Sequence, residues 1–183
     1  MTQGQWLASP DGHRWWFDSG SIALDFVHAE PFGTPSALQV WLQARFPVDA
    51  SANDRELADA LALRASISSI ASAIANGEPA AADDVDVLNL FAATPDIPPV
   101  LDGGRRQAGR TNARLGQALS AIAREAVGLF SSEARGRIRE CAADDCAIVF
   151  YDESRSNNRR WCSMQRCGNR AKVRKHRSVT RRP

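Results

Sequence analysis

The chain has 183 residues, enough for one ordinary domain and a small appendage, and its 44% of apolar residues supports a real core. Its longest unbroken apolar stretches, such as residues 146–151, are far shorter than the roughly 18 residues that a membrane-spanning helix needs. The opening sequence has neither the cationic nor the apolar region of a secretory signal. We therefore expect a cytoplasmic protein that does not bind a membrane.

The net charge of +2 conceals a strong segregation of charge along the chain. Residues 135–183 contain 14 Lys and Arg against 5 Asp and Glu, and no acidic residue follows Arg155. The preceding residues carry a net negative charge. This pattern indicates an acidic body with a basic end that binds a polyanion, although a basic run can also be a solvated tail.

Periodicity and capping residues predict that residues 1–134 form a mostly helical domain. A short strand leads into a helix between residues 13 and 30, with Asp18 or Ser19 as the N-cap. Further helices are expected over residues 36–46, 53–76, 80–93 and 112–130. A turn with a short strand is expected at residues 97–104, which include Gly103 and Gly104, and a linker is expected at Ser131 and Ser132.

Two of these helices have a clear apolar face at the helical period. In residues 53–76 the stripe consists of Leu57, Leu61, Ile67, Ile70, Ala71 and Ile74. In residues 112–130 it consists of Leu115, Leu119, Ile122, Ala126 and Leu129.

Charged side chains interrupt the apolar pattern at two places in this body. Asp25 lies inside the run Ile22–Val27, and Arg64 falls within the stripe of residues 53–76. Because a buried charge is costly unless it is paired, we expect Asp25 and Arg64 to pair or Arg64 to reach the surface. His28, one turn after Asp25, could join them. The alternative is that these side chains form the polar floor of a ligand pocket, with Trp41 or Phe26 as walls, which would make the body a sensor of a small-molecule effector.

All four cysteines lie in the last quarter of the chain, at Cys141, Cys146, Cys162 and Cys167. Their C-x4-C-x15-C-x4-C spacing is typical of two knuckles that hold one structural Zn²⁺ in a closed tetrahedral site. A reducing compartment disfavours two disulfides, and a redox pair would use a tighter C-x-x-C spacing. His176 is the alternative fourth ligand. Because so few apolar residues surround the cysteines, we expect zinc to drive the folding of this segment, with Trp161 packed beside Cys162.

The sequence around the cysteines predicts a strand, a turn and a basic helix. Residues 146–151 are rich in strand formers, and Ser163 is a candidate N-cap for a helix towards Arg177. On that helix Met164, Cys167 and Ala171 should face the metal, and the outward face should consist of Arg166, Arg170, Arg174 and Arg177.

This geometry suits the phosphate backbone or the major groove of double-stranded DNA, because guanidinium groups bind phosphate and guanine edges. Lys172 and Lys175 belong to the same basic run, and the preceding turn adds Arg155, Arg159 and Arg160. The amides of Asn157, Asn158 and Asn169 could read adenine, although Asn169 follows Gly168 and could serve a turn. A single small module buries little surface on DNA, so a homodimer is expected.

The segment CAADDCAIVFYDESRSNNRRWCSMQRCGNRAKVRKHR resembles the CGNR zinc finger, whose name stands here as Cys167-Gly168-Asn169-Arg170. The four cysteines, the run from Arg159 to Met164 and the basic run after Arg170 all match that pattern. The resemblance implies a zinc-binding module that binds DNA. In that family the finger follows an ABATE domain, described as a stress-induced transcription regulator. Residues 21–30 (SIALDFVHAE) resemble the LDFVNT-like opening of that domain, except that His28 and Ala29 replace the usual Asn-Thr.

The sequence therefore predicts a mainly α fold, with a helical N-terminal domain and a small C-terminal α+β four-cysteine zinc finger. We expect residues 1–134 to form an ABATE-like regulatory or dimerisation domain and residues 135–183 to form the finger. The predicted function is a zinc-dependent, DNA-binding transcriptional regulator that responds to stress or a metabolite. The alternative is a zinc-ribbon scaffold that binds RNA or a protein partner. An enzyme is not expected, because the chain lacks a phosphate-cradling glycine loop, a His-Glu metal pair and a nucleophile elbow.

Overall fold

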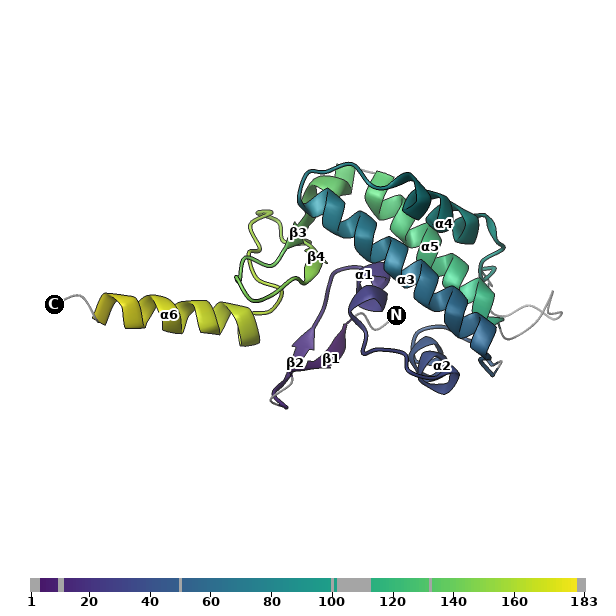
Figure 1. The fold of residues 1–183 in the computed structure, drawn as a ribbon, viewed down its shortest axis with the longest axis horizontal. Coiled ribbons are helices and arrows are strands. Elements are labelled where there is room, and N and C mark those ends of the chain that lie inside the picture. Colours follow the sequence, from purple (N-terminus) through teal and green to yellow (C-terminus); the bar gives the residue numbers. More distant parts are fainter. Residues whose placement is uncertain are drawn as a thin grey trace.

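The computed structural model describes residues 4–9, 12–49, 51–99, 101, 113–131 and 133–180, and the predicted turn at Gly103 and Gly104 lies outside them. The described residues are mainly helical, and a small cysteine-bearing region lies at one end of the helical body (Figure 1). The predicted fold class is confirmed. Residues 97–99 and 101 form no strand, so the short strand proposed for residues 97–104 is not seen in the part described.

The body consists of α1 (Ile22–His28), α2 (Pro35–Gln43), α3 (Asp54–Ala75), α4 (Ala82–Ala93) and α5 (Leu115–Ser131). The long helix α3 packs against the other four, and α4 and α5 lie along it (Figure 1). The face predicted for α5 is confirmed, because all five of its residues are buried. The stripe predicted for α3 is partly wrong: Leu61 is 42% exposed, whereas Ala60 and Leu63 are fully buried. The buried face of α3 is thus rotated from the predicted one.

Capping side chains fix where these helices begin. Asn53 starts α3 with a capping box, in which its side chain accepts from the Glu56 backbone N–H at 3.0 Å and the Glu56 carboxylate accepts from the Asn53 N–H at 3.1 Å. The predicted N-cap of α1 at Asp18 or Ser19 is wrong. Ser21 is the N-cap, because Gly20 turns the chain at φ +76° just before the helix.

Among the described residues, α3 is the one helix whose length and apolar composition would allow it to cross a membrane. No long unbroken apolar run marks this helix in the sequence, because polar and charged residues interrupt its apolar residues. In the structure, α3 is the central helix of the body, and its apolar residues pack against α1, α4 and α5. This central position accounts for part of its apolar composition, since 33% of the apolar window of α3 is buried.

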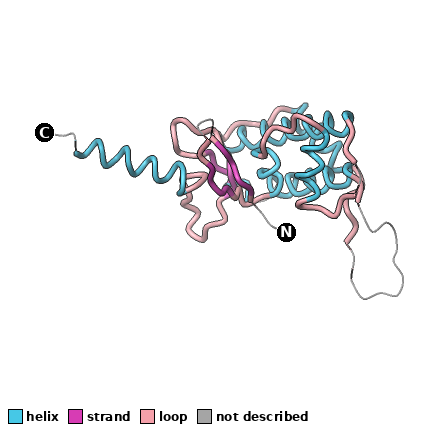
Figure 2. Tube along the Cα trace, turned by 90° about the horizontal axis from the view of Figure 1, so that it is seen from below, coloured by secondary structure: helices cyan, strands magenta, loops and turns pink. Residues whose placement is uncertain are grey.

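Two small antiparallel sheets lie between the body and the C-terminal helix (Figure 2). The first pairs β1 (Gln5–Ala8) with β2 (Arg14–Phe17), and the second pairs β3 (Ile138–Glu140) with β4 (Val149–Tyr151). Only β2 and β4 were expected from the sequence. After β4 the chain makes a π-helical turn and enters α6 (Asn169–Thr180), which projects away from the body (Figure 1).

The β3–β4 sheet joins the body to the cysteine-bearing region. Ile138 and Val149 are buried in the same apolar core as α3 and α5, whereas Phe150 faces the cysteines. The junction is also hydrogen-bonded, since the Tyr151 N–H donates to the Ser19 carbonyl at 2.7 Å. Packing therefore continues across the predicted boundary between residues 134 and 135.

Candidate metal centre and basic helix

Local structure places each of the four cysteines. Cys141 follows β3, and its N–H donates to the Ile148 carbonyl at 2.9 Å. Cys146 closes a tight turn with a 3.0 Å bond from its N–H to the Ala143 carbonyl. Cys162 precedes the N-cap Ser163, and Cys167 lies inside the π-helical turn Met164–Gly168. The paired strands and this turn thus bring cysteines 26 positions apart in the chain to one point.

The four Sγ atoms lie within 4.8 Å of one another. The Cys162–Cys167 distance is 3.5 Å and the Cys146–Cys162 distance is 3.8 Å. Four sulfurs at about 2.3 Å from one Zn²⁺ in tetrahedral geometry are about 3.8 Å apart, whereas a disulfide bond is only about 2.05 Å long. The arrangement therefore fits one zinc ion and not two disulfides. In the part of the chain that the structure describes, the cluster comprises the four cysteines, and the alternative ligand His176 does not belong to it.

The protonation of these thiols also favours a cation. Hydrogen bonds from Cys146 and Cys162 lower the pKa of Cys141, whereas donating to Cys141 raises the pKa of Cys146 to about 11 and hydrogen bonds with its neighbours raise the pKa of Cys162. Crowded thiols therefore cannot all ionise unless a positive ion compensates them, as Zn²⁺ does. A bound zinc would draw all four ligands from the protein, which leaves no open position for a substrate. The chemistry that it would supply here is structural.

Two hydrogen-bond donors outside the cysteine side chains are aimed at the sulfurs. The Arg170 Nη2 donates to Cys167 Sγ at 3.3 Å, and the Cys162 backbone N–H donates to Cys141 Sγ at 3.4 Å. Such bonds stabilise thiolates and orient metal ligands. A Cβ at Gly168 would lie 2.6 Å from the Met164 sulfur, so the flexible, half-exposed Met164 side chain would have to shift to make room for it.

An unexpected partner completes the apolar surroundings of the cysteines. Leu7, Trp15 and Phe17, on the inner face of the β1–β2 hairpin, form one buried cluster with Phe150 and three of the cysteines. Trp161 packs against the same cluster, as predicted. The finger's core was predicted to be too small without metal because the apolar residues near the cysteines in the chain are few, and the hairpin enlarges that core. The sequence of β1, QWLA, does not alternate between polar and apolar residues, so no local pattern indicated the second half of this core.

Of the arginines that were predicted to face solvent along the C-terminal helix, several contact the rest of the protein instead. Ser163 is the N-cap as expected. Arg170 and Arg174, however, point towards the turn between Cys141 and Cys146, which is the first cysteine knuckle. Arg170 pairs with Asp145 at 2.8 Å, and Arg174 pairs with Asp144 and Asp145 at 3.2 Å. Arg166 lies 4.0 Å from the Trp15 ring centroid. These partners come from distant parts of the sequence, so helical spacing alone could not reveal them.

The basic residues of the preceding turn differ in their surroundings. Arg159 is half-buried, lies 4.3 Å from the Phe150 ring centroid, and donates to the carbonyls of Asp18, Trp161 and Cys162. It therefore supports the fold, although it was predicted to contact DNA. Arg160 is exposed and lies 5.0 Å from the Trp161 ring centroid. Arg155 is exposed in the turn.

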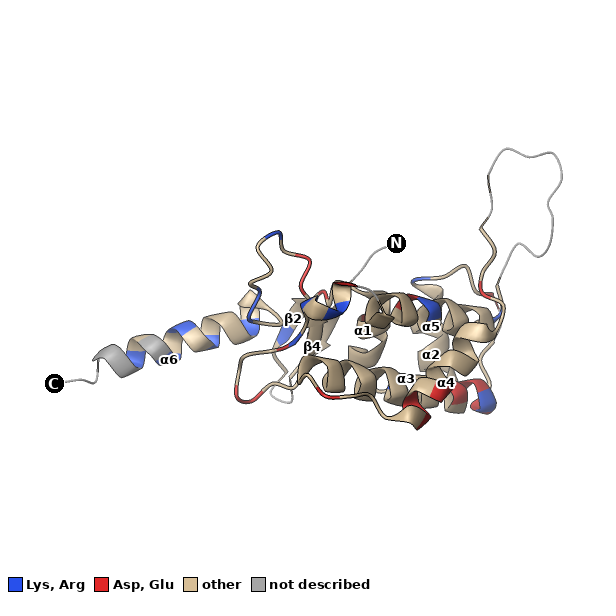
Figure 3. Ribbon diagram, turned by 90° about the horizontal axis from the view of Figure 1, so that it is seen from above, with Lys and Arg blue, Asp and Glu red and all other residues tan. Residues whose placement is uncertain are grey.

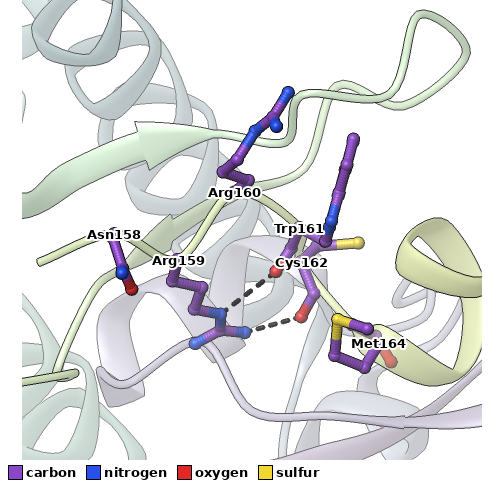
Figure 4. A pocket seen from close by; sticks show the side chains of 7 residues that line it. Asn158, Arg159, Arg160, Trp161, Cys162 and Met164 are labelled. Carbon is purple, nitrogen blue, oxygen red and sulfur yellow. Dashed lines mark hydrogen bonds between the residues drawn. The ribbon is translucent and has the colours of Figure 1, made fainter. Parts of the chain in front are cut away.

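A cavity of about 430 Å³ opens beside the zinc-ligand region (Figure 4). It is lined by Asn158, Arg159, Arg160, Trp161, Cys162, Ser163 and Met164. Figure 4 shows the Arg159 guanidinium turned to the backbone of Trp161 and Cys162. Of the two arginines that line the cavity, Arg160 is therefore the one that is not bonded to this backbone.

The remaining predicted contacts lie on the helix and in the turn. Lys172 and Arg177 are exposed on α6, and Lys175 belongs to the same helix. The predicted adenine-reading amides have local roles: Asn157 accepts from Arg139 at 3.1 Å, and Asn169 donates to the Gln165 carbonyl at 3.4 Å. The Asn158 side chain accepts from the Ser156 hydroxyl.

Four residues of the body were predicted to line a ligand pocket, and in the structure each has a hydrogen-bond partner within the protein: Asp25, His28, Arg64 and Trp41. The Asp25 carboxylate accepts from the Gly4 N–H at 2.7 Å and the Ser19 N–H at 3.1 Å, while burial raises its pKa. Arg64 donates to the carbonyls of Val27, Ala29 and Glu30 at the end of α1. The expected Asp25–Arg64 pair is therefore not formed, because backbone groups satisfy both.

The two aromatic side chains of this set are also engaged. His28 Nε2 donates to the Val149 carbonyl at 2.8 Å, and burial lowers the pKa of His28 to about 4. The Trp41 indole donates to the Gln5 side chain at 3.0 Å and packs against Phe26. These contacts support a structural role for all four residues rather than a ligand pocket.

Comparison with known families agrees with the division seen in the fold. Residues 20–133 match the ABATE family, described as "Putative stress-induced transcription regulator", and residues 137–179 match the CGNR zinc finger. No curated protein sequence matches the chain. The ABATE match covers more than half of the chain, and the finger match contains all four clustered cysteines. The chain therefore belongs to the ABATE family and carries a CGNR zinc finger at its C-terminal end.

Proposed function

We propose that this protein is a zinc-dependent transcriptional regulator that binds double-stranded DNA through α6 and performs no catalysis. The observation that carries the proposal is the cluster of four Sγ atoms within 4.8 Å at the base of α6. A metal at this point anchors one end of the helix, so that the rest can project from the body (Figure 1).

The dimensions and charge of α6 suit the major groove. Its 12 residues contain no Asp or Glu, and at 1.5 Å per residue it is about 18 Å long. A helix of about 10–12 Å diameter fits the major groove, which is about 12 Å wide. Figure 3 displays its Lys and Arg residues well away from the acidic residues of α4. This separation favours approach of the helix, rather than the body, to a polyanion.

The pairing of Arg170 and Arg174 with Asp144 and Asp145 refines this proposal. These pairs are largely exposed, so water screens them and each contributes little to folding stability. They hold the first turns of α6 against the zinc knuckle. Lys172 and Arg177 are then the side chains best suited to contact phosphates first.

Three further parts of the proposal concern the setting of this DNA binding. A single module of this size buries only about 600–1,000 Å² on DNA, which supports action as a homodimer. The family description supports a response to stress, and a small-molecule effector would have to bind outside the four satisfied residues of the body. A reducing cytoplasm would keep the four thiols available to zinc.

DNA binding by the full-length, zinc-loaded protein tests the proposal. Affinity for duplex DNA should fall steeply with salt, with a log–log slope of about −0.9 for each phosphate neutralised. Replacing Lys172 and Arg177 with Ala should make that slope shallower by about 2. Arg55→Ala is the matched control, because Arg55 is an exposed arginine at the start of α3 in the body.

Two results would contradict the proposal. One is equal DNA binding after zinc is removed with a chelator, and the other is equal binding by the Lys172/Arg177 double variant and the Arg55 control. Competition of genomic fragments with random DNA then measures whether binding is sequence-specific. If no fragment outcompetes random DNA, specific regulation of transcription is refuted.

A further inference from the structure

The outer face of the β1–β2 hairpin carries two exposed tryptophans. Side chains alternate along each strand, so that Leu7, Trp15 and Phe17 face the finger core while Trp6 and Trp16 face outward. Trp6 and Trp16 are direct cross-strand partners, with ring centroids 5.7 Å apart in an edge-on arrangement. They remain 53% and 38% exposed, respectively, which is unusual for side chains of this size.

The hairpin is held rigidly between the body and the finger. At one end, Asp25 accepts from the N–H of Gly4 and from that of Ser19, which fixes the two strands to α1. On the finger side, the Arg166 guanidinium lies over Trp15, and β2 contacts the π-helical turn before α6. Figures 1 and 3 both place β2 next to the beginning of α6.

Stability of the hairpin alone does not account for this outer face. The inner face already supplies three buried apolar side chains that attach the hairpin to the finger. A cross-strand aromatic pair adds stability to a hairpin, yet about half of the Trp6 surface remains in water. A smaller strand-forming residue would keep the pairing without exposing so much apolar area.

The charge around the two rings indicates the kind of partner. The Arg14 guanidinium lies 5.5 Å from the Trp6 ring centroid, and neither β1 nor β2 contains Asp or Glu. The adjoining α6 is basic and also lacks acidic residues. Exposed aromatic rings combined with cationic side chains are what proteins use to stack unpaired bases while neutralising the backbone.

We propose that Trp6 and Trp16 form a stacking platform for unpaired nucleobases, so that the protein binds DNA with an opened segment beside the duplex held by α6. This inference rests on the proposed function for the duplex part. It adds a second contact element from residues outside both family matches, which cover residues 20–133 and 137–179. The hairpin would recognise local opening, while α6 supplies binding to the duplex.

The test compares two oligonucleotides of one sequence, a fully paired duplex and a duplex with a central mismatched bubble. The full-length, zinc-loaded wild-type protein should bind the bubble about tenfold more tightly, since stacking contributes this order of affinity per base. Trp6→Thr, which keeps a strand-forming residue, should remove most of that preference and leave duplex affinity within about twofold. Trp6→Tyr should retain a large part of it.

Leu90→Ala is the matched control, because Leu90 is an apolar side chain on α4 that is 70% exposed. It should leave both affinities unchanged. Thermal unfolding of each variant identifies any loss that arises from a damaged hairpin, and Trp16→Thr provides a second, independent removal of a ring.

The outcomes separate the two proposals. Equal wild-type affinity for bubble and duplex, or a bubble preference that survives both Thr variants, would overturn the stacking platform and leave duplex binding by α6 intact. Binding of the bubble and of single strands without binding of duplex would refute the proposed function and support the platform. Capture of a protein through Trp6 with no effect on nucleic-acid binding would also overturn the platform.

Discussion

Acid should destabilise this protein through one half-buried histidine at the junction between the body and the finger. His28, at the end of α1, donates to the Val149 carbonyl of β4 at 2.8 Å, and its ring meets Phe17 of the hairpin edge-on. Burial lowers the pKa of His28 to about 4, the nearby Arg64 lowers it further, and the bond to Val149 opposes both effects. The folded protein therefore holds His28 in its neutral form.

The sign and size of the effect follow from this shift. The folded-state pKa lies below the ordinary value of about 6.5, so the stabilisation is present above pH 6.5 and is lost as pH falls towards 4. A difference of this size corresponds to about 3 kcal/mol in total. About 2 kcal/mol of this should be lost between pH 7 and pH 5, because at pH 5 His28 is protonated in the unfolded chain and neutral in the folded protein.

The assay is urea unfolding, followed by circular dichroism at fixed excess zinc between pH 5 and pH 7.5. The wild type is compared with His28→Gln, whose amide nitrogen reaches about as far as Nε2, can donate to the Val149 carbonyl and does not titrate. Acid also protonates the cysteines, but this contribution is common to both proteins and cancels in their difference. His13→Asn, which removes an exposed histidine from the chain segment between β1 and β2, is the control and should follow the wild type. Parallel pH dependences for the wild type and His28→Gln would refute the reasoning.

The remaining predictions concern Gly20 at the junction, the half-buried Arg159 and the metal. Gly20→Ala should lower the unfolding free energy by about 2 kcal/mol or more, because Gly20 has φ +76° and a Cβ there would lie 2.8 Å from the Tyr151 carbonyl oxygen. Gly77→Ala, at φ +72° with nothing within 4 Å, should cost only about 1 kcal/mol, and equal losses by urea unfolding would contradict this account. Arg159→Ala should cost about 2–3 kcal/mol through lost hydrogen bonds to carbonyls, whereas Arg155→Ala should leave thermal stability unchanged and weaken DNA binding. Removing zinc with a chelator should lower the thermal midpoint and expose the buried Trp15 to acrylamide quenching, and an unchanged midpoint would argue against a structural metal.

Much of the helical body could be predicted because its determinants are local. The capping box at Asn53 and the turn at Gly77 set the bounds of α3 to within a residue or two, and the heptad-like spacing of Leu115 to Leu129 identified the buried face of α5. Predictions from the local sequence were wrong where packing against another helix determines which residues are buried. Leu61 belongs to the apolar pattern of α3 but faces solvent, because the other body helices cover a different side.

The four cysteines of the candidate metal centre could also be predicted from the sequence. The side chains that pack around them could not. Cysteine spacing alone indicated a four-sulfur site, since few other chemistries use two equal knuckles. The contact between Trp15 and Arg166 joins residues about 150 positions apart, and no local pattern encodes it. The ion pair of Arg170 with Asp145 likewise depends on how the knuckle folds over the helix.

The amino-acid order by itself determined the helices, the four-cysteine set and the basic end, because each depends on residues close together in the chain. Tertiary structure alone decided which of those charges face solvent and which are paired within the protein. It also decided that the N-terminal hairpin completes the core of the C-terminal finger. The reason is physical: burial and pairing are properties of neighbours in space, and here those neighbours come from opposite ends of the chain.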